Sequence, residues 1–479
     1  MLENLRNNQK LTIIIISLAS FMGFFDISIV NVSLPTIARY FSIDISLVSW
    51  VVLIYILALS SFLIAFGSLA ERKGYKKIFL VGFLVFIIGS FLCGVSTSFN
   101  QLILFRFIQA TGAAMFSALT AAMVTTYLPT ENRGLYMGYV ATFASLGFAF
   151  GPVIGGFITQ YLNWNWIFFI NIPIGLIGII MGMPVLEEVK NKDLKGSFDF
   201  IGVILLLIAQ TTMIFALNRG LALGWTSMII IGSISASVLC WVLFFWRESK
   251  FKNPILDLNL LRNRHISLAT ISNFFFNMPN AGILVLFPFY LEMVKNIQVS
   301  QVGLILAIIP IAVLIFGPIS GRLSDRISPN KITALGALVG IISLLLLSTL
   351  TATSSILYIG IALFILGASV AVFNPPNMKF IMGESPKNMR AVTSGIVSTA
   401  RMTANAFGVA ILQTTAAIGM YLYSGAQFSK TNVTPDQIVA GFKDAYLVGA
   451  LLIVISLVLI LLIRDKNSKK NSTKKMNKI

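Results

Sequence analysis

Long apolar stretches follow one another along most of this chain, separated by short polar or basic segments. A helix needs about 20 consecutive apolar residues to cross the hydrocarbon of a bilayer. We predict fourteen transmembrane helices, at about 11–37, 47–70, 77–98, 102–128, 135–160, 166–186, 200–218, 227–246, 266–291, 302–320, 331–350, 355–382, 392–420 and 445–463. Gly and Pro interrupt several stretches, which membrane helices tolerate when neighbours satisfy the freed backbone groups. The expected fold is therefore an all-α polytopic membrane protein.

The composition agrees with a bilayer as the solvent. Of the 479 residues, 57% are hydrophobic and only 11% are charged, whereas soluble domains carry about 25% charged residues. The first span contains Asp26 and runs on to Pro35, so it does not resemble a cleaved signal peptide with a short apolar core. Cys93 and Cys240 both fall in spans and indicate no disulfide framework. His265 is the only histidine, so we expect no metal site and no enzymatic chemistry.

The net charge of +18 is unevenly distributed along the chain. Most of the 35 Lys and Arg residues lie before the first span, in every second loop and after Arg464. The alternate loops hold Arg39, Arg219, Lys295, Lys430 and Lys443. By the positive-inside rule, this places both termini in the cytoplasm. The basic surplus is thus an orientation signal and indicates no nucleic-acid partner, and we expect a disordered tail or one that touches anionic lipid.

Two segments of the chain repeat one pattern. Gly67–Lys77, between the second and third spans, is echoed by Gly321–Lys331, between the tenth and eleventh. Two such halves facing each other across a central cavity form a known transporter plan, with the substrate site near the midplane. We therefore predict a six-helix bundle at 1–190, an inserted two-helix linker at 191–264, a second six-helix bundle at 265–464 and a basic cytoplasmic tail at 465–479.

Asp26 is the one acidic residue deep within a span, and Glu292 lies at the outer edge of another. An ionised carboxylate at the bilayer centre costs about 2.5–3.5 kcal/mol, so it must face a cavity, a partner or a proton. We expect Asp26 to change protonation during a transport cycle. The alternative is that Asp26 only caps or pairs with a neighbouring helix. Arg106 is the candidate partner, unless it extends to the membrane interface instead.

Small residues and a proline gather in the fifth span, at Gly147, Gly151, Pro152, Gly155 and Gly156. Small residues let helices approach closely, and proline removes a backbone hydrogen bond and kinks a helix. We expect this helix to seal tightly against a neighbour while bending.

Together, five motifs resemble those of the major facilitator superfamily, in its fourteen-helix drug:proton antiporter branch. They are Phe25–Pro35 with Asp26 and Asn31; Gly67, Glu71, Arg72, Gly74 and Lys76; Arg106, Gln109 and Gly112; Gly147–Gly156; and Asn163–Gly175. The second motif departs from the family pattern, because Glu71 replaces Asp and Tyr75 replaces Arg. The resemblance covers nearly the whole chain.

This resemblance implies roles for the motif residues. Asp26, Asn31, Arg106 and Gln109 would serve proton coupling or substrate binding, and the glycines of the fifth span would form the antiporter motif. Gly67, Glu71, Arg72 and Gly74 would form a cytoplasmic latch, with Asp325 and Arg326 in the second half, although the same charges also serve as topology signals. Several relatives that export cationic drugs carry an extra carboxylate in the penultimate helix, where this chain has Arg401 and Asn405.

We therefore expect a secondary transporter of the cytoplasmic membrane, monomeric and without cofactors, that exports small lipophilic compounds by alternating access against an inward flow of protons. No phosphate-binding loop for ATP is present in the sequence. The alternatives are export of an endogenous lipid, metabolite or siderophore, or a non-transporting membrane sensor.

Overall fold

The computed structural model describes residues 8–129, 132–189, 199–251, 260, 262–386, 389–424 and 434–463. The described elements are helices, and fourteen helical stretches among them are long and apolar enough to cross a membrane. The expected all-α fold with fourteen spans is thereby confirmed. The predicted tail at 465–479 and residues 191–198, 252–259 and 261 of the predicted linker lie outside the described residues.

The first six spans form what we call the N-terminal half. It consists of α2 (Gln9–Phe41), α3 (Ile45–Val48), α4 (Trp50–Lys73), α5 (Tyr75–Gly94), α6 (Phe99–Ser117), α7 (Thr120–Tyr127), α8 (Arg133–Tyr161), α9 (Trp166–Phe169) and α10 (Asn171–Val185). Helix α2 packs along α8, α6 packs against α4 and α5, and α10 packs against α5 and α2. The polar residues of the candidate site lie where α2, α5, α6 and α10 meet.

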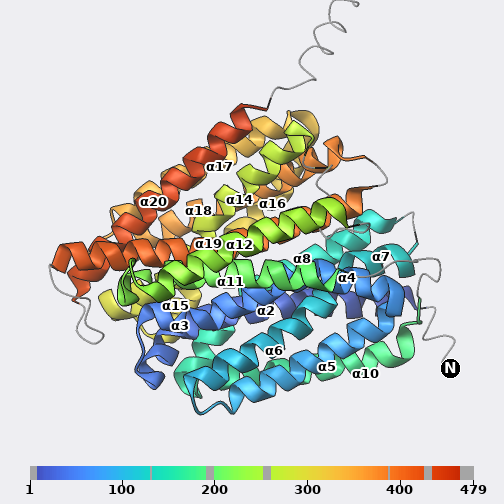
Figure 1. Cartoon of the computed structure of the whole chain (residues 1–479), viewed down its shortest axis with the longest axis horizontal. Helices are drawn as coiled ribbons and strands as arrows, with labels where there is room; N and C mark the ends of the chain where they lie inside the picture. The colour runs from blue at the N-terminus through green and yellow to red at the C-terminus, as the bar shows by residue number, and fades with distance from the viewer. Residues whose placement is uncertain are drawn as a thin grey trace, which may run out of the picture.

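The last six spans form the C-terminal half. It consists of α14 (Arg264–Phe289), the π-helix η2 (Tyr290–Val294), α15 (Val299–Leu306), α16 (Ile308–Arg326), α17 (Pro329–Ser348), α18 (Ile356–Glu384), α19 (Arg390–Ser424) and α20 (Pro435–Leu461). Figure 1 shows this half beside the N-terminal half, with the long helices of both running in roughly the same direction. The division of the chain into four domains stays a prediction.

The inserted pair, α11 (Phe200–Leu223) and α12 (Met228–Lys250), lies across the junction of the halves (Figure 1). Helix α11 packs against α4 of one half and α19 of the other. Its buried Gln210 accepts a hydrogen bond from Ser60 (2.7 Å) and donates one to Thr403 (3.2 Å). Because a polar group buried in a membrane protein needs a partner, these contacts fix α11 to both halves.

Two of the predicted helix bounds need correction. The last span begins at Pro435 rather than near residue 445, because Thr434 and Gln437 form a capping box and the proline occupies the first turn. The seventh span extends beyond 218 to Leu223, because Asn218 is buried and accepts a hydrogen bond from Trp50 (3.0 Å). In both cases, polar residues that the prediction placed outside the span are part of the helix.

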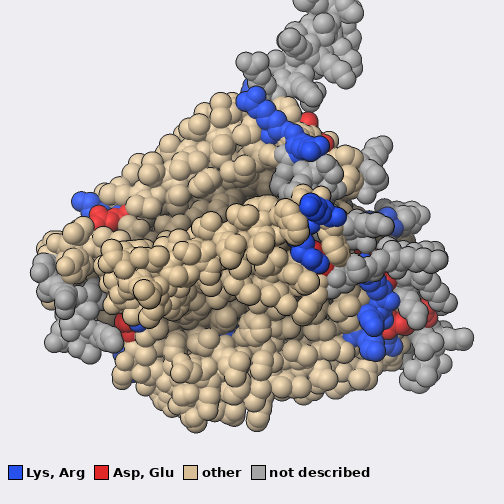
Figure 2. Space-filling view, in the orientation of Figure 1, with Lys and Arg blue, Asp and Glu red and all other residues tan. Residues whose placement is uncertain are grey.

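Charged side chains gather at the ends of the molecule and leave an apolar belt between them (Figure 2). The end that carries the loop from Gly67 to Lys77 is here called the basic end, and the other is called the opposite end. The opposite end includes Arg39, Asp44 and Arg219, with Arg219 and Asp44 3.6 Å apart.

Candidate functional site

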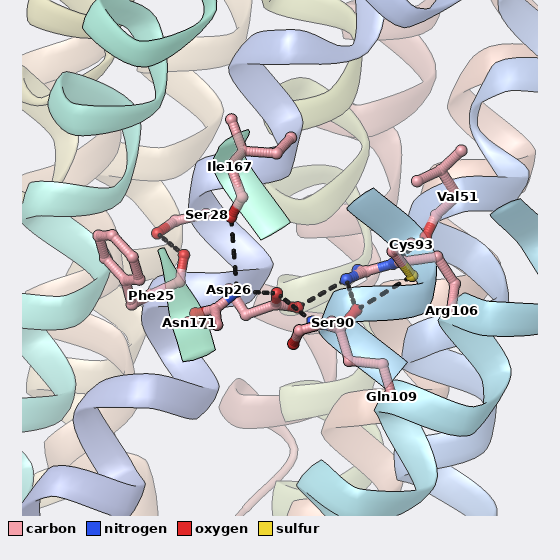
Figure 3. A network of polar contacts seen from close by, with 10 residues as sticks. All are labelled: Phe25, Asp26, Ser28, Val51, Ser90, Cys93, Arg106, Gln109, Ile167 and Asn171. Carbon is pink, nitrogen blue, oxygen red and sulfur yellow. Dashed lines mark hydrogen bonds and ion pairs between the residues drawn. The ribbon is translucent and has the colours of Figure 1, made fainter. Parts of the chain in front are cut away.

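Asp26 lies at the centre of a buried polar network in the N-terminal half (Figure 3). Its side chain is 0% exposed, and its Oδ2 lies 2.7 Å from Nη1 of Arg106, which is itself 1% exposed. Its Oδ1 accepts hydrogen bonds from Gln109 Nε2 (2.8 Å) and from Asn171 Nδ2 (3.0 Å). Three donors from α6 and α10 thus satisfy the carboxylate, and charge-assisted bonds of this kind are the strong ones.

Arg106 is held inward rather than at the membrane interface. Its Nε donates to the carbonyl of Val51 (3.0 Å), and its Nη1 also donates to Gln109 Oε1 (2.6 Å). Its guanidinium lies 4.3 Å from the ring centroid of Tyr55, a distance typical of a cation–π contact. The predicted pairing of Asp26 with Arg106 is therefore present, and extension of Arg106 to the interface is not observed.

Sequence reasoning missed two members of the network, Asn171 and Ser90. Asn171 begins α10 and donates to Asp26, while Ser90 Oγ of α5 accepts from Gln109 Nε2 at 2.8 Å. Asn171 lies within the motif Asn163–Gly175, where an amide inside an otherwise apolar span is a signal for a buried polar partner. Ser90 gives no such signal, because serine is common in membrane helices.

A central cavity of about 530 Å³ lies between the two halves, within the range of small-molecule sites. Its lining comes from α2, α4, α8, α14, α16, α18 and α19. Asn31 belongs to this lining, whereas Asp26, Arg106 and Gln109 do not. The four residues predicted for proton coupling or substrate binding thus divide into one that faces the cavity and three that are enclosed beside it.

Helix α8 packs against α2 along a line of glycines. A Cβ atom at Gly147 would lie 2.3 Å from the carbonyl oxygen of Phe21, and one at Gly151 would lie 1.8 Å from Ser28 Oγ. A Cβ atom at Gly155 would lie 2.7 Å from the carbonyl oxygen of Ile29. Because only glycine allows this approach, the motif holds α8 against the helix that carries Asp26.

The same helix seals the opposite end against the C-terminal half. A Cβ atom at Gly156 would lie 2.6 Å from the carbonyl of Val299 in α15, and one at Gly303 would lie 2.1 Å from the carbonyl of Pro152. Arg39 and Glu292 form an ion pair of 2.7 Å across the halves at this end, with the Glu292 side chain 3% exposed. The two halves are therefore closed here.

Glycines of α8 and α16 have open space around them at the basic end. Cβ atoms at Gly134 and Gly138 of α8, and at Gly317 and Gly321 of α16, would meet nothing within 4 Å. Gly317 also lines the cavity. The cavity therefore opens toward the basic end, which is the arrangement of one end-state of an alternating-access cycle.

The predicted latch residues lie at the basic end. Gly74 ends α4 with φ of 111°, and a Cβ atom there would overlap the carboxylate of Glu188, which accepts from the backbone N–H of Lys77 (3.2 Å). Partial burial raises the pKa of Glu71 above its ordinary value, and the positive charge of the adjacent Arg72 reduces this rise. Gly67 has open space around its Cα.

In the second half, Asp325 pairs with Lys379 of α18 at 2.5 Å, so this contact lies between two helices of one half. Arg326 is exposed in the last turn of α16. The latch role of these residues stays a prediction.

Comparisons with known proteins identify the family. The family model described as Major Facilitator Superfamily matches residues 16–409. The chain belongs to the major facilitator superfamily. It is 30% identical over 463 residues to the riboflavin transporter RibZ of Clostridioides difficile (strain 630), covering 96% of this chain and 98% of that protein. It is 31% identical to the multidrug resistance protein Stp of Mycobacterium tuberculosis, covering 85% and 76%.

The superfamily fold is also seen in solved structures. A bacterial homologue of the human lysosomal transporter Spinster, solved in an inward-facing and unoccupied conformation, matches with a TM-score of 0.69 and 15% identity, covering 94% of this chain and 96% of that one. The family and the exporter branch expected from the sequence are confirmed, and the relatives are transporters rather than enzymes. This superfamily member is a multi-pass membrane transporter of small molecules.

Proposed function

We propose that this transporter is a proton antiporter that exports small lipophilic compounds. The observation that carries the proposal is the fully buried ion pair of Asp26 and Arg106, with Asp26 on α2, a helix that lines the cavity. A carboxylate in the membrane interior is by default a functional residue. The similarity to a multidrug resistance protein supports an exported lipophilic substrate.

The proton acts through the network around Asp26. A proton on either carboxylate oxygen removes the charge that holds Arg106 and weakens the bonds from Gln109 and Asn171, because charge-assisted bonds are about twice as strong as neutral ones. Helix α2 carries Asp26 to this network and Asn31 to the cavity. Proton uptake therefore changes the packing of a helix that also contacts substrate, which couples the two events.

The basic end faces the cytoplasm in this proposal, and both termini lie on the cytoplasmic side of the membrane. The cavity then opens to the cytoplasm and receives substrate from that side. Proton entry along the membrane potential releases about 2.3 kcal/mol per charge at 100 mV, enough for about a fortyfold substrate gradient. The cycle requires no cofactor, and the protein works as a monomer.

Proteoliposomes containing a pH-sensitive dye test this proposal. We expect lipophilic compounds to cause proton movement that depends on substrate, and we expect Asp26→Asn to abolish this coupled movement while still binding substrate. Asp436→Asn, in the first turn of α20, is the matched control and should transport normally. Equal coupled transport by Asp26→Asn and the native chain would remove Asp26 from the mechanism.

A second candidate is transport of an endogenous metabolite. The similarity to a riboflavin transporter, which extends over nearly all of both chains, favours it. Uptake of labelled riboflavin into the same proteoliposomes distinguishes the two. Flux of riboflavin with no flux of a broad panel of drugs would favour the metabolite, and binding without flux of either would indicate a sensor.

A further inference from the structure

Arg401 is a cation in the wall of the central cavity with no partner in the described part of the chain. It lies on α19, lines the cavity and is partly buried. No hydrogen bond or ion pair joins it to another residue there. A charge in a membrane interior is costly without a counter-charge, and an unpaired guanidinium is therefore a feature that needs an explanation.

The acids of the membrane interior are already engaged elsewhere. The cavity lining contains no Asp or Glu among the residues that the structure describes. Asp26 is enclosed with Arg106, and Glu292 is paired with Arg39 at the opposite end. The cavity therefore carries a net positive charge, and the counter-charge for Arg401 must come from what enters it.

Amide groups in the same cavity lining as Arg401 provide further donors. Asn405 lies one turn along α19, on the same face as Arg401, and it too lines the cavity without a hydrogen bond in the described chain. The amide oxygen of Asn374 accepts from Asn273 (3.2 Å) and Asn277 (3.4 Å), which leaves its Nδ2 to donate. A guanidinium with neighbouring amide donors is a typical arrangement for binding a carboxylate, sulfonate or phosphate.

The remaining lining is apolar. It includes Phe24, Ile56, Phe148, Leu284, Val313 and Met402. Aromatic and methionine side chains suit adaptable apolar binding. We propose that the cavity takes amphipathic organic anions, with the anionic group on Arg401 and the apolar body against these side chains.

This inference rests on the proposed transport function, because it names the class of compound that the same cavity carries. It also predicts discrimination. A neutral compound leaves Arg401 without a counter-charge, and a cation adds repulsion, so both bind more weakly than a matched anion.

A dansyl series tests the inference with one fluorophore in three charge states: dansylglycine, its uncharged methyl ester, and cationic dansylcadaverine. Binding is measured by the rise in dansyl fluorescence, at constant ionic strength, to purified protein in phosphatidylcholine nanodiscs. We expect the native chain to bind the anion at least about tenfold more tightly than the ester. We expect Arg401→Gln to bind the anion and the ester equally, and Arg401→Lys to keep part of the preference.

Arg322→Gln, exposed on α16, is the matched control and should keep the full preference. Equal binding of anion and ester by the native chain, preference for the cation, persistence of the preference in Arg401→Gln, or no binding of any dansyl compound would each overturn the inference. Loss of dansylglycine binding in phosphatidylglycerol nanodiscs would confirm the anion site and assign the anionic group to a lipid headgroup.

The outcome is separable from that of the proposed function. An Arg401-dependent preference for anions without coupled proton movement would support the site and contradict antiport. Proton-coupled export of neutral compounds, without any preference for anions, would support antiport and contradict the site.

Discussion

Asp26 and Arg106 carry opposite charges in a part of the molecule that water does not reach in this conformation. Both side chains are essentially unexposed, and Gln109 links them by bonding to each. Breaking a buried ion pair by removing one member leaves an uncompensated charge, which costs more than replacing both members by apolar residues. The pair therefore links stability to the proton that we propose it binds.

We expect Arg106→Met to destabilise the protein by about 3–5 kcal/mol, because the buried carboxyl group of Asp26 loses its counter-charge. The double variant Asp26→Leu/Arg106→Met should lose much less. Thermal unfolding in detergent, followed by tryptophan fluorescence, measures both. The exposed Arg322→Met is the control. An Arg106→Met transition as high as that of the control would show that the pair contributes nothing.

At the scale of the element, α8 combines two functions in one helix. Its glycines allow contact with α2 along one line, and Pro152 and Gly156 contact α15 of the other half. The α-helix continues through Pro152 from Arg133 to Tyr161. Helix α8 therefore joins α2, which carries Asp26, to α15 at the closed opposite end.

We expect Gly151→Ala to lower stability by about 1–3 kcal/mol, the usual effect of overpacking, because the added Cβ would overlap Ser28 Oγ. Adding Ser28→Gly should restore part of the loss, since the hydroxyl is then absent. Gly138→Ala, which has open space around it, is the control. Melting temperatures of the variants check the prediction, and equal values for Gly151→Ala and Gly138→Ala would refute it.

Helix α11 offers a second prediction at this scale. Gln210→Leu removes the hydrogen bonds to Ser60 and Thr403. Ser60 keeps its bond to the carbonyl of Leu57 (2.9 Å), but Thr403 loses its partner on α11, and leaving a buried polar group unsatisfied costs about 1–3 kcal/mol. We expect a correspondingly lower melting temperature. Thr212→Ala on the same helix loses bonds only within α11 and should change little. An unchanged melting temperature in Gln210→Leu would mean that the contacts of α11 with the two halves do not contribute to stability.

At the scale of the whole molecule, closure at one end and separation at the other define the conformation. Among the described residues, the ion pair of Arg39 with Glu292 joins the two halves at the closed end. The cavity reaches the basic end past Gly317. Opening the opposite end requires this pair to separate, so its strength sets part of the balance between the two end-states.

We expect Glu292→Gln to shift the balance toward opening at the opposite end. The reporter is Asn31→Cys in the cavity, in a background of Cys93→Ser and Cys240→Ser. With Glu292→Gln, this cysteine should react about two- to fivefold faster with an impermeant maleimide added from that end than it does without Glu292→Gln. The size of the effect follows because a partly exposed ion pair is worth up to about 1 kcal/mol. The exchange Arg39→Glu/Glu292→Arg should restore the slow rate. Asp325→Asn, whose pair lies within one half, is the control, and an unchanged rate in Glu292→Gln would contradict the prediction.

The amino-acid sequence by itself determined the span count, the family and the residues of the buried network on α2 and α6. Hydrophobic length and a carboxylate within a span are local properties, because the bilayer imposes both along a single helix. The start of α11 at residue 200 was also read correctly, since its cap at Asp199 is local. Its end at Leu223 was not, because Asn218 is held by partners on other helices. The end of α20 was close to the prediction, but its start at Pro435 was placed ten residues too late, although the capping box that begins this helix is local.

Tertiary structure alone decided which polar residues face the cavity and which are enclosed beside it. Asp26 and Asn31 lie on one helix, yet one bonds to Arg106 and Asn171 and the other lines the cavity. The pairing of Arg39 with Glu292 and the absence of a partner for Arg401 in the described chain likewise depend on helices distant in sequence. The physical reason is that a charge in a membrane protein is stabilised or left unpaired by what packs against it, and packing between helices is not encoded in any one of them.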